Sequence, residues 1–411
     1  MDVLYRCCAG LDIHKDTVVA CVRRLDEHGH LSEEIRTFGT MTVALLSLAD
    51  WLAEHGVTHA AMESTGVYWK PVYHVLEGQF ELLLVNAQHI KQVPGRKTDV
   101  KDCAWIAQLL QHGLLKGSLV PPPFQRELRD LTRQRTQMVR EQARVAQRIQ
   151  KVLEDANIKL ASVATDVMGA SGREMLRALI AGTTDAKEMA KLAKGRLKAK
   201  KASLQQALTG RVTDHHRFML SMHLTHYEQL EALIAQFNER IGGQLVPFVQ
   251  EVELLKTIPG IAERTAEVLL AEIGPDLTPF PTADHLASWA GMCPGNNESA
   301  GKRRSGGTRK GNQWLRSALI QIAWAASRTK DTYLSAHFRR LKARRGAKRA
   351  AVAVSHTILV IIYHVLTRKS IYQDLGADYL DRLGADRLTH QLVKRLERLG
   401  HKVTLQPQQA A

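Results

Sequence analysis

The sequence predicts a mixed α/β domain at the N-terminus, followed by a helical connector and a mostly helical C-terminal domain. Short apolar runs alternate with amphipathic segments over the first 120 residues, and three consecutive prolines at 121–123 end this unit because they cannot continue a helix. Beyond the prolines, apolar residues recur at helical spacing. A chain of 411 residues is too long for one hydrophobic core. We therefore expect three domains, at 1–120, 121–250 and 251–411.

The first domain begins with a predicted β-hairpin. Residues 5–13 and 17–23 are rich in Val, Cys and Leu, and the polar turn 14–16 separates them. A third strand is expected near 35–38. Helices and strands then alternate: a helix at 43–54, a strand at 58–62, a helix at 67–76, a strand at 82–86 and a helix at 99–112. The order βββαβαβα predicts a mixed sheet covered by helices.

A long basic helix is expected after the prolines, over residues 124–152. Apolar residues recur every seven positions from Leu131 to Val152, while arginines occupy the other faces. This pattern is typical of a coiled coil or of an antiparallel helical hairpin. Arg135 and Gln142 interrupt the apolar stripe, which favours a packed helical arm over an extended two-stranded zipper. Residues 160–250 are expected to be mostly helical.

The C-terminal domain opens with two short predicted helices over 254–274, joined by the turn Pro259-Gly260-Ile261. This pattern resembles a helix-hairpin-helix element, in which backbone N–H groups at the turn around Gly260 bind a DNA phosphate without reading base sequence. A plain helical hairpin packed in a core is the alternative.

A basic segment follows at 289–312, and its glycines, asparagines and serines predict a loop. Its cations are suited to binding phosphates; they are Lys302, Arg303, Arg304, Arg309 and Lys310. A hydroxyl among them could attack phosphorus while Arg303 or Arg304 balances the developing negative charge. On chemistry alone, Ser299, Ser305 and Thr308 are equivalent candidates for this nucleophile.

Four carboxylates of the first domain are candidates for a metal site: Asp12, Glu63, Asp99 and Asp102. Asp12 lies near the end of the first strand, Glu63 at the end of the strand 58–62, and Asp99 and Asp102 three residues apart on the last helix. If these ends converge, hard oxygen ligands suit Mg²⁺ or Mn²⁺. The alternatives are structural, because Asp99 could cap a helix and Glu63 could belong to an ordinary turn.

The amino-acid composition indicates which classes of molecule the chain could bind. The net charge of +16, from 57 Lys and Arg against 41 Asp and Glu, suits a polyanion such as nucleic acid. The five cysteines show no ligand spacing for a structural zinc site. No stretch is expected to be apolar over enough length to span a membrane, and the N-terminus lacks the layout of a secretory signal. A cytoplasmic location is therefore expected.

Taken together, several motifs resemble a known family. They are GLDIHKD, MESTGVYWKP, KTDVKD, LLKTIPGI and GMCPGNNESAGKRRSGGTRKGNQWLR, in this order over nearly the whole chain. This set resembles the DEDD-type transposases of bacterial insertion sequences, whose first domain is RuvC-like with an RNase H fold.

The resemblance implies roles for particular residues. Asp12, Glu63, Asp99 and Asp102 would bind Mg²⁺, and Ser299 would be the nucleophile that joins covalently to DNA. In many family members glycine follows this serine directly, whereas here Ala300 precedes Gly301, so Ser305 stays a second choice. The resemblance also implies a noncoding guide RNA and a homo-oligomer, dimer or tetramer, as partners.

The function expected from the sequence is therefore a Mg²⁺-dependent transposase that cuts and rejoins DNA through a phosphoserine intermediate. No nucleotide-binding loop of the GxxxxGK[ST] type is present, which agrees with a reaction that needs no ATP. Two alternatives stay open. One is a structure-selective nuclease of the same fold that uses activated water, and the other is a nucleic-acid-binding protein without catalytic activity.

Overall fold

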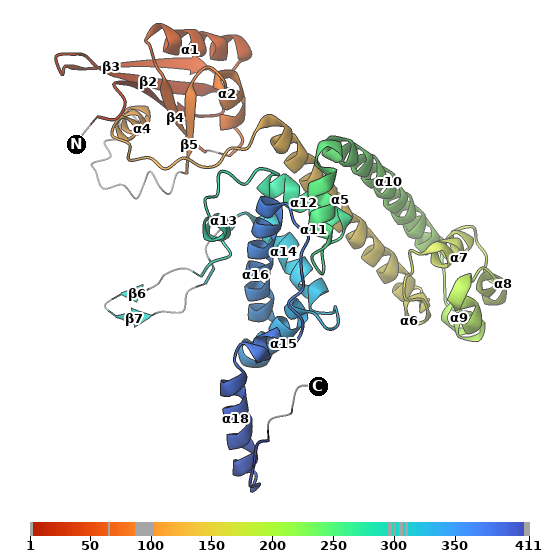
Figure 1. Ribbon diagram of the computed structural model, residues 1–411. Helices are drawn as coiled ribbons and strands as arrows, with labels where there is room; N and C mark the ends of the chain where they lie inside the picture. The colour runs from red at the N-terminus through yellow and green to blue at the C-terminus, as the bar shows by residue number, and fades with distance from the viewer. Residues whose placement is uncertain are drawn as a thin grey trace. The chain divides into compact units, whose positions relative to one another are not determined.

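The computed structural model describes residues 3–64, 66–86, 102–294, 298–299, 301–303, 307–308 and 311–406, with the backbone alone at 298–299, 302–303 and 387–388. The chain divides into two compact units, Met1–Pro121 and Pro122–Ala411 (Figure 1). The further division expected at residue 250 lies within the second unit and stays a prediction.

The first unit contains a five-stranded sheet in the order β3-β2-β1-β4-β5. The strands are β1 (Cys7–Ile13), β2 (Thr17–Leu25), β3 (Leu31–Gly39), β4 (His59–Glu63) and β5 (Glu81–Val85). Strand β2 is antiparallel to both β1 and β3, and β1, β4 and β5 run parallel. The mixed sheet and the order of its elements agree with the prediction and are compatible with an RNase H-like fold.

Helices cover both faces of the sheet because the strands bury side chains on both sides. On one face, α1 (Thr42–Glu54) and α2 (Trp69–Leu76) pack on alternate residues of β1 that include Leu11. On the other face, α4 (Asp102–Gln111) packs on the intervening residues that include Cys8. The two apolar clusters fix which residues of β1 point toward α4.

An antiparallel pair of long helices dominates the start of the second unit (Figure 1). They are α5 (Pro123–Asp155) and α10 (Asp214–Leu245). Contacts run in opposite order along them, from His216 Nε2 at 2.9 Å from Asp155 Oδ2 to the stacked rings of Phe124 and Phe248 just beyond α10. The segment between them packs on the far end of α5 and contains α6 (Leu160–Val163), α7 (Ala170–Ile180), α8 (Ala186–Lys191), η1 (Gly195–Lys200) and α9 (Lys201–Ala207).

Helices are the main elements of the described residues beyond α10. They are η2 (Val246–Phe248), α11 (Val249–Lys256), α12 (Glu263–Ile273), α13 (Ala283–Trp289), α14 (Gln313–Ala326), α15 (Tyr333–Arg345), α16 (Ala347–Arg368), α17 (Tyr379–Arg382) and α18 (Ala385–Arg398). Contacts with α11, α13, α14 and α15 place α16 at the centre of this group.

Helix α16 corrects one expectation from the sequence. Among the described residues, it is the one helix that is long and apolar enough to cross a membrane by length and composition. Half of its most apolar window is buried by neighbouring helices, with Val354, Ile358 and Ile362 buried completely. The apolar sequence therefore serves a core helix, which satisfies the same length and composition criteria as a membrane span.

Candidate functional site

The ends of two parallel strands bring two of the predicted carboxylates to the same edge of the sheet. The register pairs Leu11 of β1 with Met62 of β4, so Asp12 and Glu63 follow at the same level on adjacent strands. Neighbouring strands lie about 4.8 Å apart, and paired residues of parallel strands point to the same face. The Asp12 side chain is 20% exposed, and its Oδ2 lies 3.3 Å from Nε2 of His14.

The first turn of α4 lies beside the same end of β1. A Cβ atom on Gly10 would be 2.1 Å from the carbonyl oxygen of Cys103 and 2.4 Å from the nitrogen of Ala107, so only glycine permits this approach. Farther along the helix, the Cys8 thiol donates to the Ala107 carbonyl. Helix α4 therefore runs antiparallel to β1 and starts, at Asp102, near the strand end that carries Asp12.

An electrostatic effect supports this placement. A hydrogen bond with the Cys21 thiol lowers the pKa of Cys103, and the negative charge of Asp12 acts in the opposite direction. Asp12 therefore lies close enough to the first turn of α4 to influence the residue that follows Asp102.

The donor set matches a hard divalent cation in kind, but the described residues do not complete a site. Within the ranges given above, no three His, Cys, Asp or Glu side chains lie close enough together to hold one metal ion. The fourth predicted ligand, Asp99, lies outside the described residues. Asp12, Glu63 and Asp102 thus come from three elements that meet at one end of the sheet, without forming a closed coordination sphere among themselves.

The segment around the predicted nucleophile forms a β-hairpin, where the sequence analysis expected a loop. Strand β6 (Glu298–Ser299) pairs antiparallel with β7 (Lys302–Arg303), and Pro294 forms an isolated bridge with Thr308. Ser299 pairs with Lys302, which leaves a two-residue connection whose second residue, Gly301, has φ 71°. Positive φ at this turn position favours glycine. Ser299 therefore belongs to the strand that precedes this turn.

The remaining candidates of this segment cannot be placed. Arg304, Ser305, Arg309 and Lys310 lie outside the described residues, and Ser299, Lys302 and Arg303 are described by their backbone alone.

The two ends of the hairpin segment converge at the start of α14. A Cβ on Gly311 would lie 2.4 Å from the carbonyl oxygen of Ala290, so the chain leaving the hairpin touches the chain entering it. The next residue, Asn312, caps α14: its Oδ1 accepts from the backbone N–H groups of Trp314 at 3.0 Å and Leu315 at 3.2 Å.

The turn that contains Gly260 packs on another helix of the same unit. The turn between α11 and α12 packs against α14, and a Cβ on Gly260 would lie 2.7 Å from the carbonyl oxygen of Ile322. Its φ of 92° and this close approach both account for the glycine. Both interpretations from the sequence account for this packing, and the phosphate contact at Gly260 stays a prediction.

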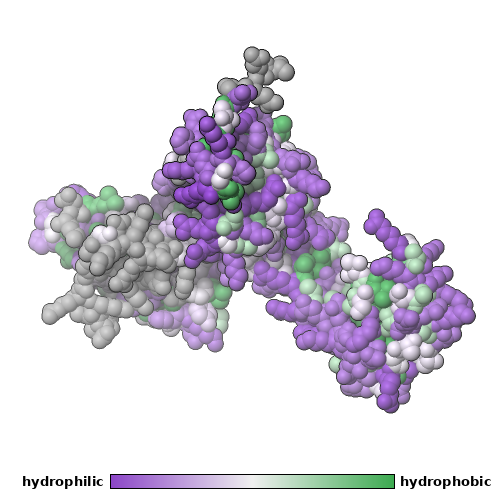
Figure 2. All heavy atoms as spheres, turned by 90° about the horizontal axis from the view of Figure 1, so that it is seen from below, coloured by the Kyte–Doolittle hydropathy of each residue, from purple (hydrophilic) through white to green (hydrophobic). Residues whose placement is uncertain are grey.

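The sequence analysis missed an aromatic and cationic surface where α5 meets α14. The guanidinium carbons of Arg133 and Arg140 lie 5.8 and 5.5 Å from the ring centroid of Trp314. These residues border clefts of about 670 and 200 Å³, the smaller of which also includes Arg264. The visible face in Figure 2 is mostly hydrophilic, with hydrophobic residues in small separate patches. Trp314 lies within a quoted motif, but its arginine neighbours are 170 or more positions away in sequence, so no local pattern links them.

Two family models match the chain. The first match lies mostly in the first unit and extends into the second, and the second match lies within the second unit. A DEDD-type IS110 transposase model matches residues 9–158, and the model of the transposase IS116/IS110/IS902 family matches residues 252–339. The first range contains all four predicted carboxylates, and the second contains Ser299 and its basic neighbours.

Similar proteins support the same family. The transposase for insertion sequence element IS1111A from Coxiella burnetii is 25% identical over 89% of this chain and 90% of its own length. A protein of insertion element IS110 from Streptomyces coelicolor is 41% identical, but the match spans only 24% of this chain and 23% of that protein. The pilin gene-inverting protein of Moraxella bovis is 33% identical over 32% of this chain and 43% of its own length. With both family domains present in the expected order, the chain belongs to the DEDD-type transposases of insertion sequences, in the IS110 group.

Proposed function

We propose that this chain cuts and rejoins DNA through a covalent phosphoserine intermediate formed by Ser299, with Asp12, Glu63, Asp99 and Asp102 as ligands of Mg²⁺. The observation that supports this most is the register of β1 and β4, which places Asp12 and Glu63 at one edge of the sheet beside the first turn of α4. Carboxylates at adjacent strand ends repel one another, and a bound cation relieves this repulsion.

The reaction follows from the chemistry of these groups. The Ser299 hydroxyl attacks phosphorus, the Ser Oγ–P bond forms, the P–O bond to the leaving strand breaks, and the serine proton passes to the departing sugar oxygen. A strand hydroxyl then attacks the phosphoserine and releases the serine. DEDD-type transposases generally use divalent ions, and bound Mg²⁺ would supply charge stabilisation at the phosphate. Lys302, which pairs with Ser299 across the hairpin, would balance the negative charge of the phosphoryl oxygens.

The test is a search for the covalent intermediate. The full-length protein is incubated with Mg²⁺ and duplex DNA that carries the ends of its own element, and a denaturant-resistant protein–DNA adduct is sought on a gel. We expect an adduct with the native chain and with Ser305→Ala or Thr308→Ala, and none with Ser299→Ala. An adduct that persists in Ser299→Ala and disappears in Ser305→Ala would move the nucleophile to Ser305.

The second candidate function is a structure-selective nuclease of the same fold, in which water replaces the serine. It predicts strand cleavage without any adduct, and cleavage that survives Ser299→Ala. Retention of recombination after combined Asp12→Asn and Asp102→Asn changes would contradict both catalytic proposals and leave a binding protein.

We also propose that the chain binds an RNA, forms an oligomer and acts in the cytoplasm. Arg140 and Trp314 offer a cation and an aromatic face, the combination that binds single-stranded nucleic acid. Sequencing of RNA that co-purifies with the protein, expressed from its whole element, tests the guide. A preparation that carries no specific RNA and gains no activity from added RNA would exclude the guided part.

A further inference from the structure

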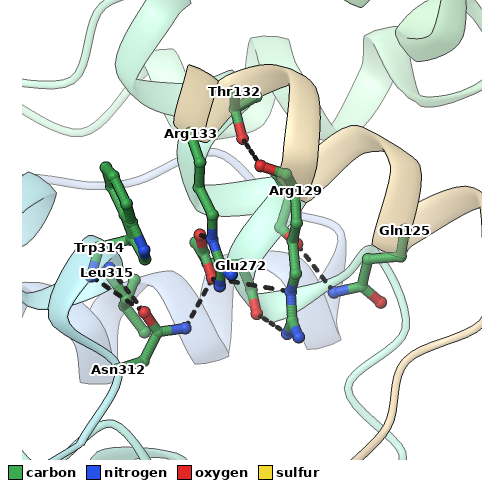
Figure 3. A network of polar contacts seen from close by, with 9 residues as sticks. Gln125, Arg129, Thr132, Arg133, Glu272, Asn312, Trp314 and Leu315 are labelled. Atoms are coloured by element: carbon green, nitrogen blue, oxygen red, sulfur yellow. Dashed lines mark hydrogen bonds and ion pairs between the residues drawn. The ribbon is translucent and has the colours of Figure 1, made fainter. Parts of the chain in front are cut away.

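A buried carboxylate links three elements near the point where the hairpin that contains Ser299 meets the start of α14. We call this hairpin the serine hairpin and this point, at Gly311 and Asn312, its root. Glu272, on α12, is completely buried, and both of its oxygens accept hydrogen bonds. Arg133 of α5 donates to Oε1 and Oε2, each at 2.7 Å, and Asn312 donates its Nδ2–H to Oε2 at 2.6 Å. Figure 3 shows these side chains converging from α5, α12 and the start of α14.

Helix α5, which we call the arm, also contacts this carboxylate through a second arginine, Arg129. Arg129 Nε lies 3.6 Å from Glu272 Oε2 and donates to the Ala271 carbonyl at 3.0 Å, and Gln125 donates to the same carbonyl at 3.1 Å. Burial lowers the pKa of Arg129, and the charge of Glu272 acts in the opposite direction. Both charges of this pair are therefore removed from water, which is costly unless each is matched by its partner.

Asn312 has two tasks in this arrangement. Its Oδ1 caps α14, while its Nδ2 reaches the buried carboxylate. Because Gly311 touches the chain entering the hairpin, the anchor at Asn312 restrains both ends of the segment that contains Ser299. An ion pair used only for stability could be replaced by apolar side chains of similar volume. The carboxylate of this pair also accepts a hydrogen bond from Asn312 at the hairpin root, which apolar side chains could not do.

We propose that Glu272 is a positioning residue for the serine hairpin, which it fixes through Asn312 to the arm helix α5. This inference rests on the proposed role of Ser299 as nucleophile. The arm then sets where the hairpin root lies, because Arg129 and Arg133 hold the carboxylate to which that root is bound. A displacement of about 1 Å at reacting groups is enough to reduce a rate by about 100-fold.

The variant Asn312→Ser separates the anchor from the cap. Serine caps helices as well as asparagine does, but it has no amide that could reach Glu272. The matched control is Asn238→Ser, which removes an Asn–Arg contact of the same unit: Asn238 Oδ1 accepts from Arg135 at 3.2 Å, away from the hairpin. Thermal unfolding of both full-length variants shows whether either is destabilised overall.

The first readout needs no catalytic activity. Trypsin cleaves after lysine and arginine, so peptides ending at 302–310 report opening of the hairpin, and peptides ending at 194–201 give an internal reference. Loss of one hydrogen bond to a buried charge should raise hairpin cleavage about tenfold in Asn312→Ser and leave it unchanged in Asn238→Ser. Equal hairpin cleavage in Asn312→Ser and the native chain would overturn the proposal.

The second readout separates positioning from binding. In Asn312→Ser, the single-turnover rate of adduct formation on element-end DNA should fall at least about tenfold, while DNA affinity stays within about twofold. Asn312→Asp, which sets two carboxylates against each other, should reduce the rate further. A parallel fall of affinity and rate would contradict positioning.

Failure of the proposed function is distinguishable from failure of this inference. If Ser299→Ala still forms an adduct, the nucleophile is another residue, and trypsin cleavage alone decides whether Glu272 anchors the hairpin. If Ser299 is the nucleophile and both readouts of Asn312→Ser match the native chain, only the positioning role is wrong.

Discussion

At the scale of single residues, the most constrained position near the predicted metal site is Gly10. The residue has no side chain of its own to contribute, yet it determines how closely α4 approaches β1. The carbonyl of Cys103 occupies the space where a Cβ would stand, and this carbonyl belongs to the backbone, which cannot turn aside as a flexible side chain could. The position of Asp102 relative to Asp12 therefore depends on a glycine.

Substitution of Gly10 tests this dependence. Gly10→Ala should lower the free energy of unfolding of the first unit by at least about 1–3 kcal/mol, because the overpacked helix must move away from the strand. Gly39→Ala is the control, since a Cβ there would meet only the Ala44 methyl at an ordinary 3.6 Å. Urea unfolding followed by circular dichroism measures both. Equal midpoints for Gly10→Ala and the native chain would show that α4 does not depend on this contact.

At the scale of elements, the strands and helices of the first unit were predictable and the packing of the arm was not. The nearly continuous burial along β1 follows from its mostly apolar sequence. The stripe of α5 that faces α12, however, contains Gln125, Thr132 and Arg135, all buried. Arg135 forms an ion pair with Glu267 of α12, more than 130 residues away. A pattern of apolar residues cannot reveal a buried polar stripe whose partners lie so far along the chain.

The candidate site also has parts that the sequence could predict and parts that it could not. Asp12, Glu63 and Asp102 could be proposed from strand ends and a helix start, because those positions follow from local patterns. The anchor formed by Glu272 and Asn312 depends on a tertiary contact between α12 and the start of α14. The hairpin was missed because its strands contain only two residues each, too short for an alternating pattern.

Helix α15 gives a prediction about pH. Burial lowers the pKa of His337, and the positive charge of Arg340 acts in the same direction. The ring of His337 stacks on Tyr333, with centroids 5.6 Å apart. The folded state therefore favours the neutral imidazole, so its stabilising contribution is present above the ordinary pKa of about 6.5 and is lost as pH falls through the lower folded value.

Thermal unfolding between pH 5 and pH 8 measures this effect. His337→Phe keeps an aromatic ring on Tyr333 and removes the titrating group, so its melting temperature should fall less than that of the native chain below pH 6.5. His390→Gln, at an exposed position of α18, controls for the loss of a histidine. The same acid dependence in His337→Phe and the native chain would assign the effect to other groups.

At the scale of the whole molecule, charge is divided between the two units. Residues 1–121 contain 11 Lys and Arg against 14 Asp and Glu, whereas residues 122–411 contain 46 against 27, so the net charges are −3 and +19. The unit with the predicted acidic cluster repels phosphate overall. The second unit supplies all of the positive excess, and we therefore expect it to provide most of the affinity for DNA.

Salt dependence tests this division in the full-length chain. Each phosphate contact made by a cation steepens the slope of log affinity against log salt by about 0.9. Three exposed cations at the corner between α15 and α16 are compared with three exposed cations of the first unit: Arg344, Arg345 and Lys348 against Arg6, Lys15 and Arg24. Changing the first set to glutamine should weaken binding to a duplex and flatten the slope by up to about 3. The second set removes the same charge from the molecule, so equal losses from both sets would mean that net charge, and not its location in the second unit, determines DNA affinity.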